Sequence, residues 1–463
     1  MDRKWTKRAS SDYECGRTLI TKLQIYIGLF IISALTFYTY HIFYANYEKV
    51  THIREKYLKE HHNDINIAVV WPDYKDTTFI KGVELAKDLI NAKNNFSIEY
   101  TTDKNEKINR KINIIYYPEG SKKQGQESAK LIAEDKTIAA VIGHDRSTTA
   151  IPASISYQYN GIVYMSPVAT SNVLTQHKFT YVFRNAPRDT DFAKALFNFC
   201  NKRGLKKIAV LYSRGTYGTN FSDIFVEIAA GFNIEDEQDL GDLQKVMTKK
   251  DDDPKVKAIT EVTNNSATPK NKLQIVVQKS YSPESHDFLH LVSELSPYDY
   301  DCIFIAGLLS NKAGELIKQL RRFDINVPII GGDGLDSALL SEIPNEASNN
   351  TFVASVFSHD ALDKDVKGND KKVNFDLRKE YKLKYGIEPD YDAAQGFEAL
   401  FVLAQAFVRA RSTSPLLVSS TLRAFDDFIG ASGKISFSND GDIEQKVIFI
   451  KEMKNGEFIR VGD

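Results

Sequence analysis

A run of glycine and hydroxyl residues between Val141 and Pro152 has the clearest capacity to bind a ligand. It reads VIGHDRSTTAIP, so an apolar strand pattern ends in glycine and hydroxyl residues begin a helix pattern. Backbone N–H groups at the start of a helix have no partner within the helix and attract an anion, and Ser147 adds a hydroxyl donor there. We therefore expect a carboxylate-sized group to bind here. The alternative is that Ser147 and Thr148 only cap the helix, which is the commoner role of such residues.

A second loop of this kind, Met165 to Ser171, follows the next strand pattern. Parallel strands end at the same edge of a sheet, so the backbone of this loop and the side chain of Thr170 are expected beside Ser147. Two adjacent loops make a better anion site than one.

Two stretches in the later half of the chain are expected to face these loops. Tyr217 lies in the sequence SRGTYG directly after a strand pattern, and Asp333 lies in IGGDG after another. The glycines let the backbone approach a ligand closely, and Asp333 supplies an anion. The alternative is that Asp333 only caps the next helix. The glycine run is no phosphate loop, because no Gly-Lys-Ser/Thr follows it.

Nothing in the sequence predicts catalysis, a metal site or a cofactor. His144 lies three residues before Ser147, but no acid is in place to orient it as a base. His61 and His62 lack a third metal ligand, and the three aspartates at 251–253 lack the spacing of a calcium loop. We therefore predict a protein that is not an enzyme and that holds no metal and no cofactor.

The elements that must position these residues alternate between strand and helix patterns from Ile65 onward. This alternation is typical of parallel sheets with crossover helices, and it restarts after residues 181–185. The expected strands lie at 65–70, 112–117, 138–143 and 162–165, and then at 207–212, 273–279, 302–306 and 328–331. A helix is expected at 285–295, and a hairpin of 434–437 and 444–450 around an Asp-Gly turn. Two series imply two lobes with a ligand between their carboxyl edges.

These patterns predict an α/β fold of two doubly wound lobes with a hinge. We assign residues 64–186 and 358–432 to lobe 1, and residues 187–357 and 433–463 to lobe 2. The stretch 235–271 has few apolar residues and is expected to be a flexible polar insertion. With 60 basic and 61 acidic residues, the formal net charge of -1 gives no reason to expect a nucleic-acid partner.

An apolar segment near the N-terminus favours a membrane anchor. Ile25 to Phe43 contains no Asp, Glu, Lys or Arg and approaches the roughly 20 residues that a helix needs to cross the hydrocarbon. Basic residues precede it, which favours a cytoplasmic N-terminus. A cleaved signal peptide is the alternative, but the apolar run exceeds the usual core of such peptides. We expect a cytoplasmic tail at 1–24, a transmembrane helix at 25–44 and a stalk at 45–63.

The three cysteines do not predict a disulfide bridge. Cys15 falls in the expected cytoplasmic tail, while Cys200 ends a helix pattern and Cys302 begins a strand pattern. A bridge between the last two is possible, but no spacing suggests it, and buried free thiols are favoured.

From Ile65 to its end, the chain resembles the branched-chain amino-acid-binding (Leu/Ile/Val-binding) family, type I periplasmic binding proteins that deliver amino acids to ABC transporters. The resemblance lies in the order and spacing of the stretches 141–147 with 152–154, 161–162 with 166–170, and 217–218. It covers nearly all of the chain outside the anchor and the insertion. It implies a two-lobed type I periplasmic-binding fold, preceded here by one N-terminal transmembrane helix.

The resemblance also implies residue roles. Ser147, Ala169 and Thr170 would hold the α-carboxylate of the ligand, partly through backbone amides. Tyr217 and Asp333 would face its α-ammonium, so that a zwitterion is held between the lobes.

The departures from the family pattern concern the wall of the pocket. The loop from Trp71 to Asp76 is shorter and more charged than in the family, Leu308 and Leu309 stand where the family tends to have Tyr, and Asp333 stands in place of the usual Glu. The ligand's side chain therefore need not be a branched aliphatic one. Candidate wall residues are Trp71, Tyr74, Val168, Leu308 and Tyr391.

These observations predict a membrane-tethered protein whose soluble domain lies in the periplasm or outside the cell. It would bind an amino acid or similar small zwitterion and work with an ABC permease or a sensor partner. The alternative is a binding fold reused as a protein-interaction module of the envelope, which the polar insertion and the altered first loop motivate.

Overall fold

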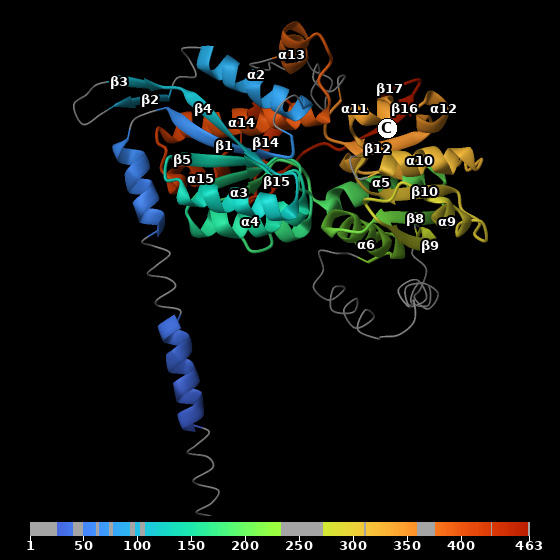
Figure 1. Ribbon diagram of the computed structural model, residues 1–463, viewed down its shortest axis with the longest axis horizontal. Coiled ribbons are helices and arrows are strands. Elements are labelled where there is room, and N and C mark those ends of the chain that lie inside the picture. Colours follow the sequence, from blue (N-terminus) through green and yellow to red (C-terminus); the bar gives the residue numbers. More distant parts are fainter. Residues whose placement is uncertain are drawn as a thin grey trace, which may run out of the picture.

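The computed structural model describes residues 26–39, 50–61, 64–73, 77–92, 98–101, 107–232, 272–309, 312–358, 376–426 and 428–461. Within them, two α/β lobes lie side by side, each built around its own sheet (Figure 1). The predicted α/β fold of two lobes is therefore confirmed. The insertion predicted at 235–271, Tyr74 and Cys15 lie outside the described residues.

Lobe 1 contains a five-stranded parallel sheet in the order β4-β1-β5-β6-β7. Its strands are β1 (Ile65–Trp71), β4 (Ile112–Pro118), β5 (Ile138–Gly143), β6 (Val163–Ser166) and β7 (Val182–Arg184). The central strands are apolar along most of their length because helices cover both faces of the sheet. One face packs on α2 (Thr78–Ala92) and α14 (Tyr391–Ala410), the other on α3 (Lys122–Glu134) and α4 (Ser147–Tyr159) (Figure 1). A separate hairpin pairs β2 (Ile98–Thr101) with β3 (Lys107–Arg110).

Lobe 2 contains a seven-stranded sheet in the order β17-β16-β12-β11-β10-β8-β9. Its strands are β8 (Lys207–Ser213), β9 (Gln274–Tyr281), β10 (Cys302–Ala306), β11 (Ile329–Gly331), β12 (Thr351–Ser355), β16 (Phe449–Lys454) and β17 (Glu457–Arg460). Alternate residues of a strand face opposite sides, so Ile208 and Val210 share a core with α5 (Asp189–Arg203) and α6 (Thr216–Ala230). Ala209 and Leu211 share another core with α9 (Leu289–Ser293) and α10 (Ala313–Arg322). Cys200 and Cys302 are buried and free, as predicted.

Shorter elements complete the loops and the passage between the lobes. They are η2 (Asn172–Leu174), η4 (Asp333–Leu335), α11 (Ala338–Ser341), α12 (Asn345–Ser348), α13 (Leu377–Tyr385), α15 (Pro415–Arg423), β13 (Phe428–Gly430), β14 (Gly433–Phe437) and β15 (Ile443–Glu444). The chain passes between the lobes after β7, after β12 and after β15.

Buried charges are paired at this passage, which we call the crossing and define by Arg184, Glu398, Asp442 and Lys446. The Arg184 guanidinium is fully buried and donates through Nε to Asp442 Oδ1 at 3.0 Å. The Lys446 ammonium donates to Glu398, and both side chains are at most 1% exposed. Every one of these carboxylates has a cation of the protein beside it.

Two predicted elements differ in the structure. The strand predicted at 444–450 is wrong, because β15 ends at Glu444 and β16 begins only at Phe449. The reason is that the two ends pair with different sheets, β15 with β14 and β16 with β12. The helix predicted at 285–295 is confined to Leu289–Ser293, since a turn hydrogen bond between Ser285 and Ser282 precedes it.

The N-terminal part contains two helical stretches, residues 26–39 and 50–60. None of the helices among the described residues combines the length and apolarity that a membrane crossing requires. The helix predicted at 25–44 extends at both ends beyond the stretch 26–39, into residues that the structure does not describe.

The helix 50–60 falls within the predicted stalk and packs against lobe 1. Arg54 is buried and donates to the backbone carbonyls of residues 133, 135, 138 and 160 at 2.6 to 3.0 Å. Leu58 is buried as well. This part of the stalk is therefore a docked helix rather than a free spacer.

Candidate functional site

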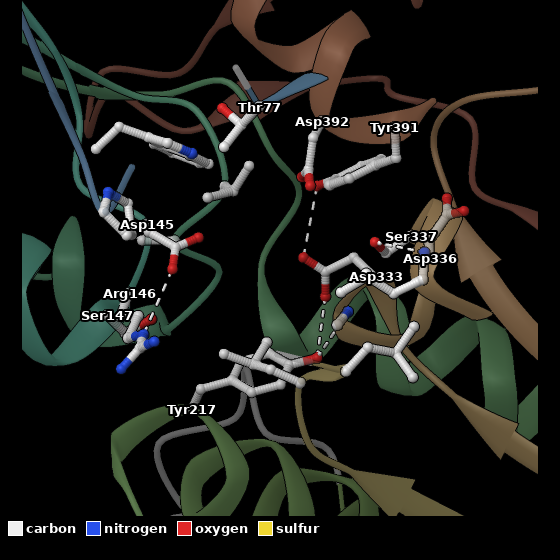
Figure 2. A pocket seen from close by; sticks show the side chains of 18 of the residues that line it. Thr77, Asp145, Arg146, Ser147, Tyr217, Asp333, Asp336, Ser337, Tyr391 and Asp392 are labelled. Atoms are coloured by element: carbon white, nitrogen blue, oxygen red, sulfur yellow. Dashed lines mark hydrogen bonds and ion pairs between the residues drawn. The ribbon is translucent and has the colours of Figure 1, made fainter. Parts of the chain in front are cut away.

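A cavity of about 240 Å³ lies between the two lobes and is lined by residues of both (Figure 2). This volume is just below the ~300–1,000 Å³ of pockets for drug-sized ligands, so the cavity suits a small molecule. Its lining residues are Trp71, Pro72, Asp73, Thr77, Asp145, Arg146, Ser147, Val168, Ala169, Tyr217, Leu308, Leu309, Asp333, Gly334, Asp336, Ser337, Leu339, Tyr391 and Asp392.

On the lobe 1 side, the loop from β5 to α4 presents a helix start to the cavity. Gly143 has a φ of 141°, and a Cβ atom there would lie 2.3 Å from the Val70 carbonyl oxygen, so only glycine fits this turn. Arg146 occupies the N-cap position and makes no side-chain capping bond. The Ser147 hydroxyl is 2% exposed and has no hydrogen-bond partner among the described residues. It therefore does not cap the helix and is available to a ligand.

A buried network supports this loop from behind. His144 Nδ1 lies 2.8 Å from Glu119 Oε2, and its Nε2 lies 2.9 Å from the Tyr157 hydroxyl. Thr149 donates to the same Glu119 carboxylate. The sequence did not reveal that His144 has an acid partner. Since both ring nitrogens are engaged away from Ser147, this histidine is not positioned to activate that hydroxyl.

The second lobe 1 loop contributes Val168 and Ala169 to the cavity. Thr170 is fully buried and is not among the lining residues. Its carbonyl oxygen accepts from Arg184 Nη1 and from the Asp189 amide, both at 2.8 Å. The backbone of Thr170 is therefore held at the crossing.

On the lobe 2 side, Tyr217 and Asp333 form a hydrogen-bonded pair. Tyr217 lies in the first turn of α6 and donates its hydroxyl to Asp333 Oδ1 at 3.0 Å. The Gly334 amide donates back to the Tyr217 oxygen at 3.3 Å. A side chain at Gly334 would meet the Gly307 carbonyl oxygen at 2.6 Å, which explains why this close approach needs glycine. Tyr391 of lobe 1 reaches the other Asp333 oxygen at 3.5 Å, at the limit of hydrogen bonding.

Burial dominates the electrostatics of this acid. Burial, and after it the nearby Asp189 carboxylate, raise the pKa of Asp333 to about 7, while the hydrogen bond from Tyr217 opposes the rise. Burial likewise raises the pKa of Asp189 to about 7. A cation placed against Asp333 would favour its ionised form.

Sequence reasoning missed further carboxylates of the cavity, among them Asp145 and Asp392. Burial raises the pKa of Asp145 to about 6, although Arg146 acts against it. Burial also raises the pKa of Asp392 well above its ordinary value, and the carboxylates of Asp390 and Asp145 add to this rise. The signal was present in the sequence, since Asp145 lies two residues before Ser147 and Asp392 directly follows the predicted wall residue Tyr391.

The predicted wall residues also meet at the cavity. Trp71 stacks on Phe79 with ring centroids 3.6 Å apart, which fixes the indole at the cavity wall. Val168, Leu308 and Tyr391 line the cavity as well, whereas Tyr74 lies outside the described residues. Of the residues predicted to hold the ligand's charged groups, Ser147, Ala169, Tyr217 and Asp333 line the cavity, and Thr170 does not.

Within the described residues, no group of three or more His, Cys, Asp or Glu side chains is arranged to hold a metal ion. His61 lies in the docked N-terminal part, where its ring stacks on Tyr57.

The comparison with protein families settles the relationship. The model of the receptor family ligand binding region matches residues 81–456. The chain belongs to this family. The match spans both lobes and every cavity residue from Asp145 to Asp392.

Relatives of the chain include proteins named for the binding of Leu, Ile and Val. The chain is 25% identical to the Leu/Ile/Val-binding protein BraC3 of Rhizobium johnstonii over 343 residues, which is 73% of this chain and 79% of that protein. The predicted resemblance to the Leu/Ile/Val-binding proteins is thereby confirmed.

Solved structures show the same fold. The leucine-binding protein LivK of Thermotoga maritima aligns with a TM-score of 0.67 at 20% identity, covering 86% of this chain and 98% of that one. The substrate-binding protein LivJ of Streptococcus pneumoniae, solved in complex with isoleucine, aligns with a TM-score of 0.62 at 20% identity, covering 86% of this chain and 100% of that one. The two-lobed type I periplasmic-binding fold is confirmed.

Proposed function

We propose that this protein is an extracytoplasmic solute-binding protein that holds an amino acid or similar small zwitterion between its lobes. The observation that carries this proposal is the opposed pair of charge-binding groups across the cavity. The start of α4 with the free Ser147 hydroxyl lies on one side, and the Tyr217–Asp333 pair lies on the other (Figure 2). The first suits a carboxylate and the second an ammonium group.

The arrangement also supports a binding mechanism. A ligand that contacts both lobes stabilises the closed arrangement of the lobes through its differential contacts with it. Relatives named as Leu/Ile/Val-binding proteins, and similar structures named as ABC transporter components, support a role in uptake through an ABC permease or in sensing. These proteins are named for binding and not for a reaction, which supports a role without catalysis.

Thermal unfolding of the full chain in detergent tests this proposal. Each of the twenty amino acids is added in turn, and at a concentration near 100 Kd a true ligand stabilises the folded protein by about 2.7 kcal/mol. We expect at least one amino acid to raise Tm, and we expect Ser147→Ala and Asp333→Asn to abolish the rise. Asp426→Asn, an exposed aspartate outside the cavity, is the matched control.

If no amino acid or related zwitterion raises Tm of the wild-type chain, the proposal is wrong. A stable protein partner recovered with the same chain would then favour the alternative of an envelope interaction module.

We further propose that residues 25–44 anchor the protein in the cytoplasmic membrane, with 1–24 on the cytoplasmic side. The uncharged apolar run supports this, as do the exposed apolar side chains of its helical part, among them Phe30 at 74% and Phe37 at 69%. Membranes washed with alkaline carbonate should retain the full chain. A variant lacking residues 1–44 should appear in the soluble fraction, and release of the full chain by carbonate would contradict the anchor.

A further inference from the structure

The cavity holds more negative charge than a single ammonium group needs. Its lining includes one cation, Arg146, and five carboxylates, which are Asp73, Asp145, Asp333, Asp336 and Asp392. The Lys451 ammonium neutralises Asp336, since it lies 2.6 and 2.8 Å from the two carboxylate oxygens. Asp73 is exposed at the rim. Once Asp333 is matched to the α-ammonium, Asp145 and Asp392 are left on the lobe 1 side.

These two carboxylates line the same cavity and have little protein charge to balance them. Figure 2 shows the carboxyl groups of Asp145, Asp333 and Asp392 around the same space. Among the described residues, Asp145 pairs with Arg146, whose Nε lies 3.4 Å from its carboxylate and whose side chain is 39% exposed. Within the described part of the chain, Asp392 makes neither an ion pair nor a hydrogen bond, and its recorded interactions are repulsions from other carboxylates.

The helix that carries Asp392 does not need it as a cap. Asp390 is the N-cap residue of α14 and accepts the Ala393 amide at 2.9 Å, while its other oxygen accepts the Thr78 hydroxyl at 2.9 Å. An acid in the first turn gains from the helix dipole, but only by roughly 0.3–1 kcal/mol. That gain is small against the cost of holding several carboxylates around one cavity.

An independent feature indicates that this space receives a ligand. The Ser147 hydroxyl is 2% exposed, lines the same cavity and has no hydrogen-bond partner within the described residues. Buried hydroxyls are normally hydrogen-bonded, so this one points to a group that is bound from outside the protein. With Ser147 and the start of α4 taking the ligand's carboxylate, Asp145 lies only two residues away from that end of the ligand.

We propose that the ligand carries a second positive charge on its side chain, as a basic amino acid does, and that Asp392 together with Asp145 binds that charge. This proposal rests on the proposed function, because it assigns the α-carboxylate and α-ammonium to the residues named there. Trp71 lines the same cavity, and its ring can pack on the alkyl stem or the cationic head of such a side chain. The relatives are named for aliphatic ligands, whereas the acids of this cavity suit a cationic side chain.

Isothermal titration calorimetry of the full chain in detergent tests the proposal with matched pairs of ligands. Arginine is compared with citrulline, which has the same shape without the charge, and lysine is compared with norleucine. In at least one pair we expect the cationic member to bind about tenfold more tightly or better, a difference near 1.4 kcal/mol. Asp392→Asn should reduce that preference to about threefold or less while the neutral member's Kd changes by about twofold at most. Asp426→Asn should change neither.

The outcomes separate this proposal from the proposed function. Equal or tighter binding of the neutral members, or of leucine, overturns the second-charge proposal and leaves amino-acid binding in place. An equal loss for both members of a pair in Asp392→Asn also overturns it, because the residue would then act through structure alone. Binding of no amino acid at all overturns both proposals. If Asp392→Asn does not fold, the wild-type preference must weaken with added salt, and a preference independent of salt overturns the proposal.

Discussion

At the crossing, Glu398 is paired with Lys446 and Asp442 with Arg184. In the cavity, no cation of the protein lies beside Asp333 or Asp392 among the described residues. Both regions bury carboxylates between the same two lobes. At the crossing, the Arg184 guanidinium also donates to the carbonyl oxygens of Thr170 and Ser171 at 2.8 and 2.6 Å. In the cavity, two tyrosine hydroxyls are the recorded side-chain donors to Asp333.

The charges at the crossing stabilise the fold, whereas those in the cavity are available to bind a ligand. A buried carboxylate with its own cation is satisfied in every state of the protein. A buried carboxylate without one costs free energy until a cation arrives, and that cost is returned on binding. The carboxylates of the cavity are therefore expected to lower the stability of the ligand-free protein and to select its ligand, whereas the charge pairs of the crossing stabilise the fold. Four experiments examine this contrast.

The largest effect should follow from breaking the crossing. Lys446→Met leaves the buried Glu398 carboxylate without its cation, and breaking such a pair costs about 3–5 kcal/mol. Urea unfolding of the ligand-free chain, followed by intrinsic fluorescence, measures the loss. The double variant Glu398→Gln with Lys446→Met removes both charges and should be more stable than Lys446→Met alone. If the double variant is the less stable one, the pair does not act by charge balance.

The second effect is a fall in stability with rising pH. Burial raises the pKa of Asp333 and Asp189 to about 7 and that of Asp145 to about 6, whereas aspartates of the unfolded chain titrate near ~3.9. Between about pH 4 and pH 7 the folded protein thus binds more protons than the unfolded chain, so its stability falls as pH rises. At about 1.4 kcal/mol per pKa unit, these groups make the ligand-free protein more stable at pH 5 than at pH 8 by at most about 7 kcal/mol. Urea unfolding at both values measures this, and an increase toward pH 8 would contradict it.

The third effect is a gain in stability that accompanies a loss of function. Asp333→Asn keeps an oxygen that accepts the Tyr217 hydroxyl and removes the buried charge. At pH 8 the ligand-free variant should be more stable than the wild type by on the order of 1–3 kcal/mol, because the cost of ionising a buried acid disappears. At pH 4 the gain should vanish, since Asp333 is then protonated in the folded protein. Urea unfolding of the variant and of the wild type at pH 8 and at pH 4 measures both differences, and destabilisation at pH 8 would show that Asp333 belongs with the crossing.

Much of the fold was predictable from the sequence because parallel strands buried on both faces leave a clear pattern. The runs at 65–70 and 138–143 are continuous apolar stretches, and the strands β1 and β5 begin at the predicted residues. The crossing was not predictable, because its charge pairs join residues far apart in sequence, such as Arg184 and Asp442. The strand predicted at 444–450 failed for the same reason, since its two ends belong to different sheets.

The candidate site was predictable where a glycine or hydroxyl follows a strand, as for Ser147 and Asp333. It was not predictable where residues far apart in the sequence meet in the fold. Asp392 lies on α14, more than two hundred residues after Asp145, and only the packing of that helix on lobe 1 brings the two carboxylates to one cavity. Thr170 shows the opposite case, since a residue in the right loop is fully buried and does not line the cavity, and its carbonyl oxygen is held by Arg184.

The smallest effect should come from a charge cluster at the surface. Arg378 and Lys382 lie 2.9 and 2.7 Å from the Glu388 carboxylate, and their hydrogen bonds lower its pKa to about 2. Glu388 is 32% exposed, however, and exposed ion pairs contribute only about 0–1 kcal/mol. Glu388→Gln should therefore cost less than about 1 kcal/mol at pH 7. Because the folded pKa is depressed, the contribution is present above about pH 4 and is lost as pH falls toward 2.

Urea unfolding at pH 7 measures this small loss of stability. It is done in low salt and in about 0.5 M salt, and the added salt should make the loss smaller because it screens exposed charges. A loss as large as that of Lys446→Met would contradict the contrast, because it would mean that pairing matters as much at the surface as in the interior. A small loss supports the view that burial gives a charge pair its weight. The same burial that makes Glu398 depend on Lys446 then makes Asp333 depend on a ligand.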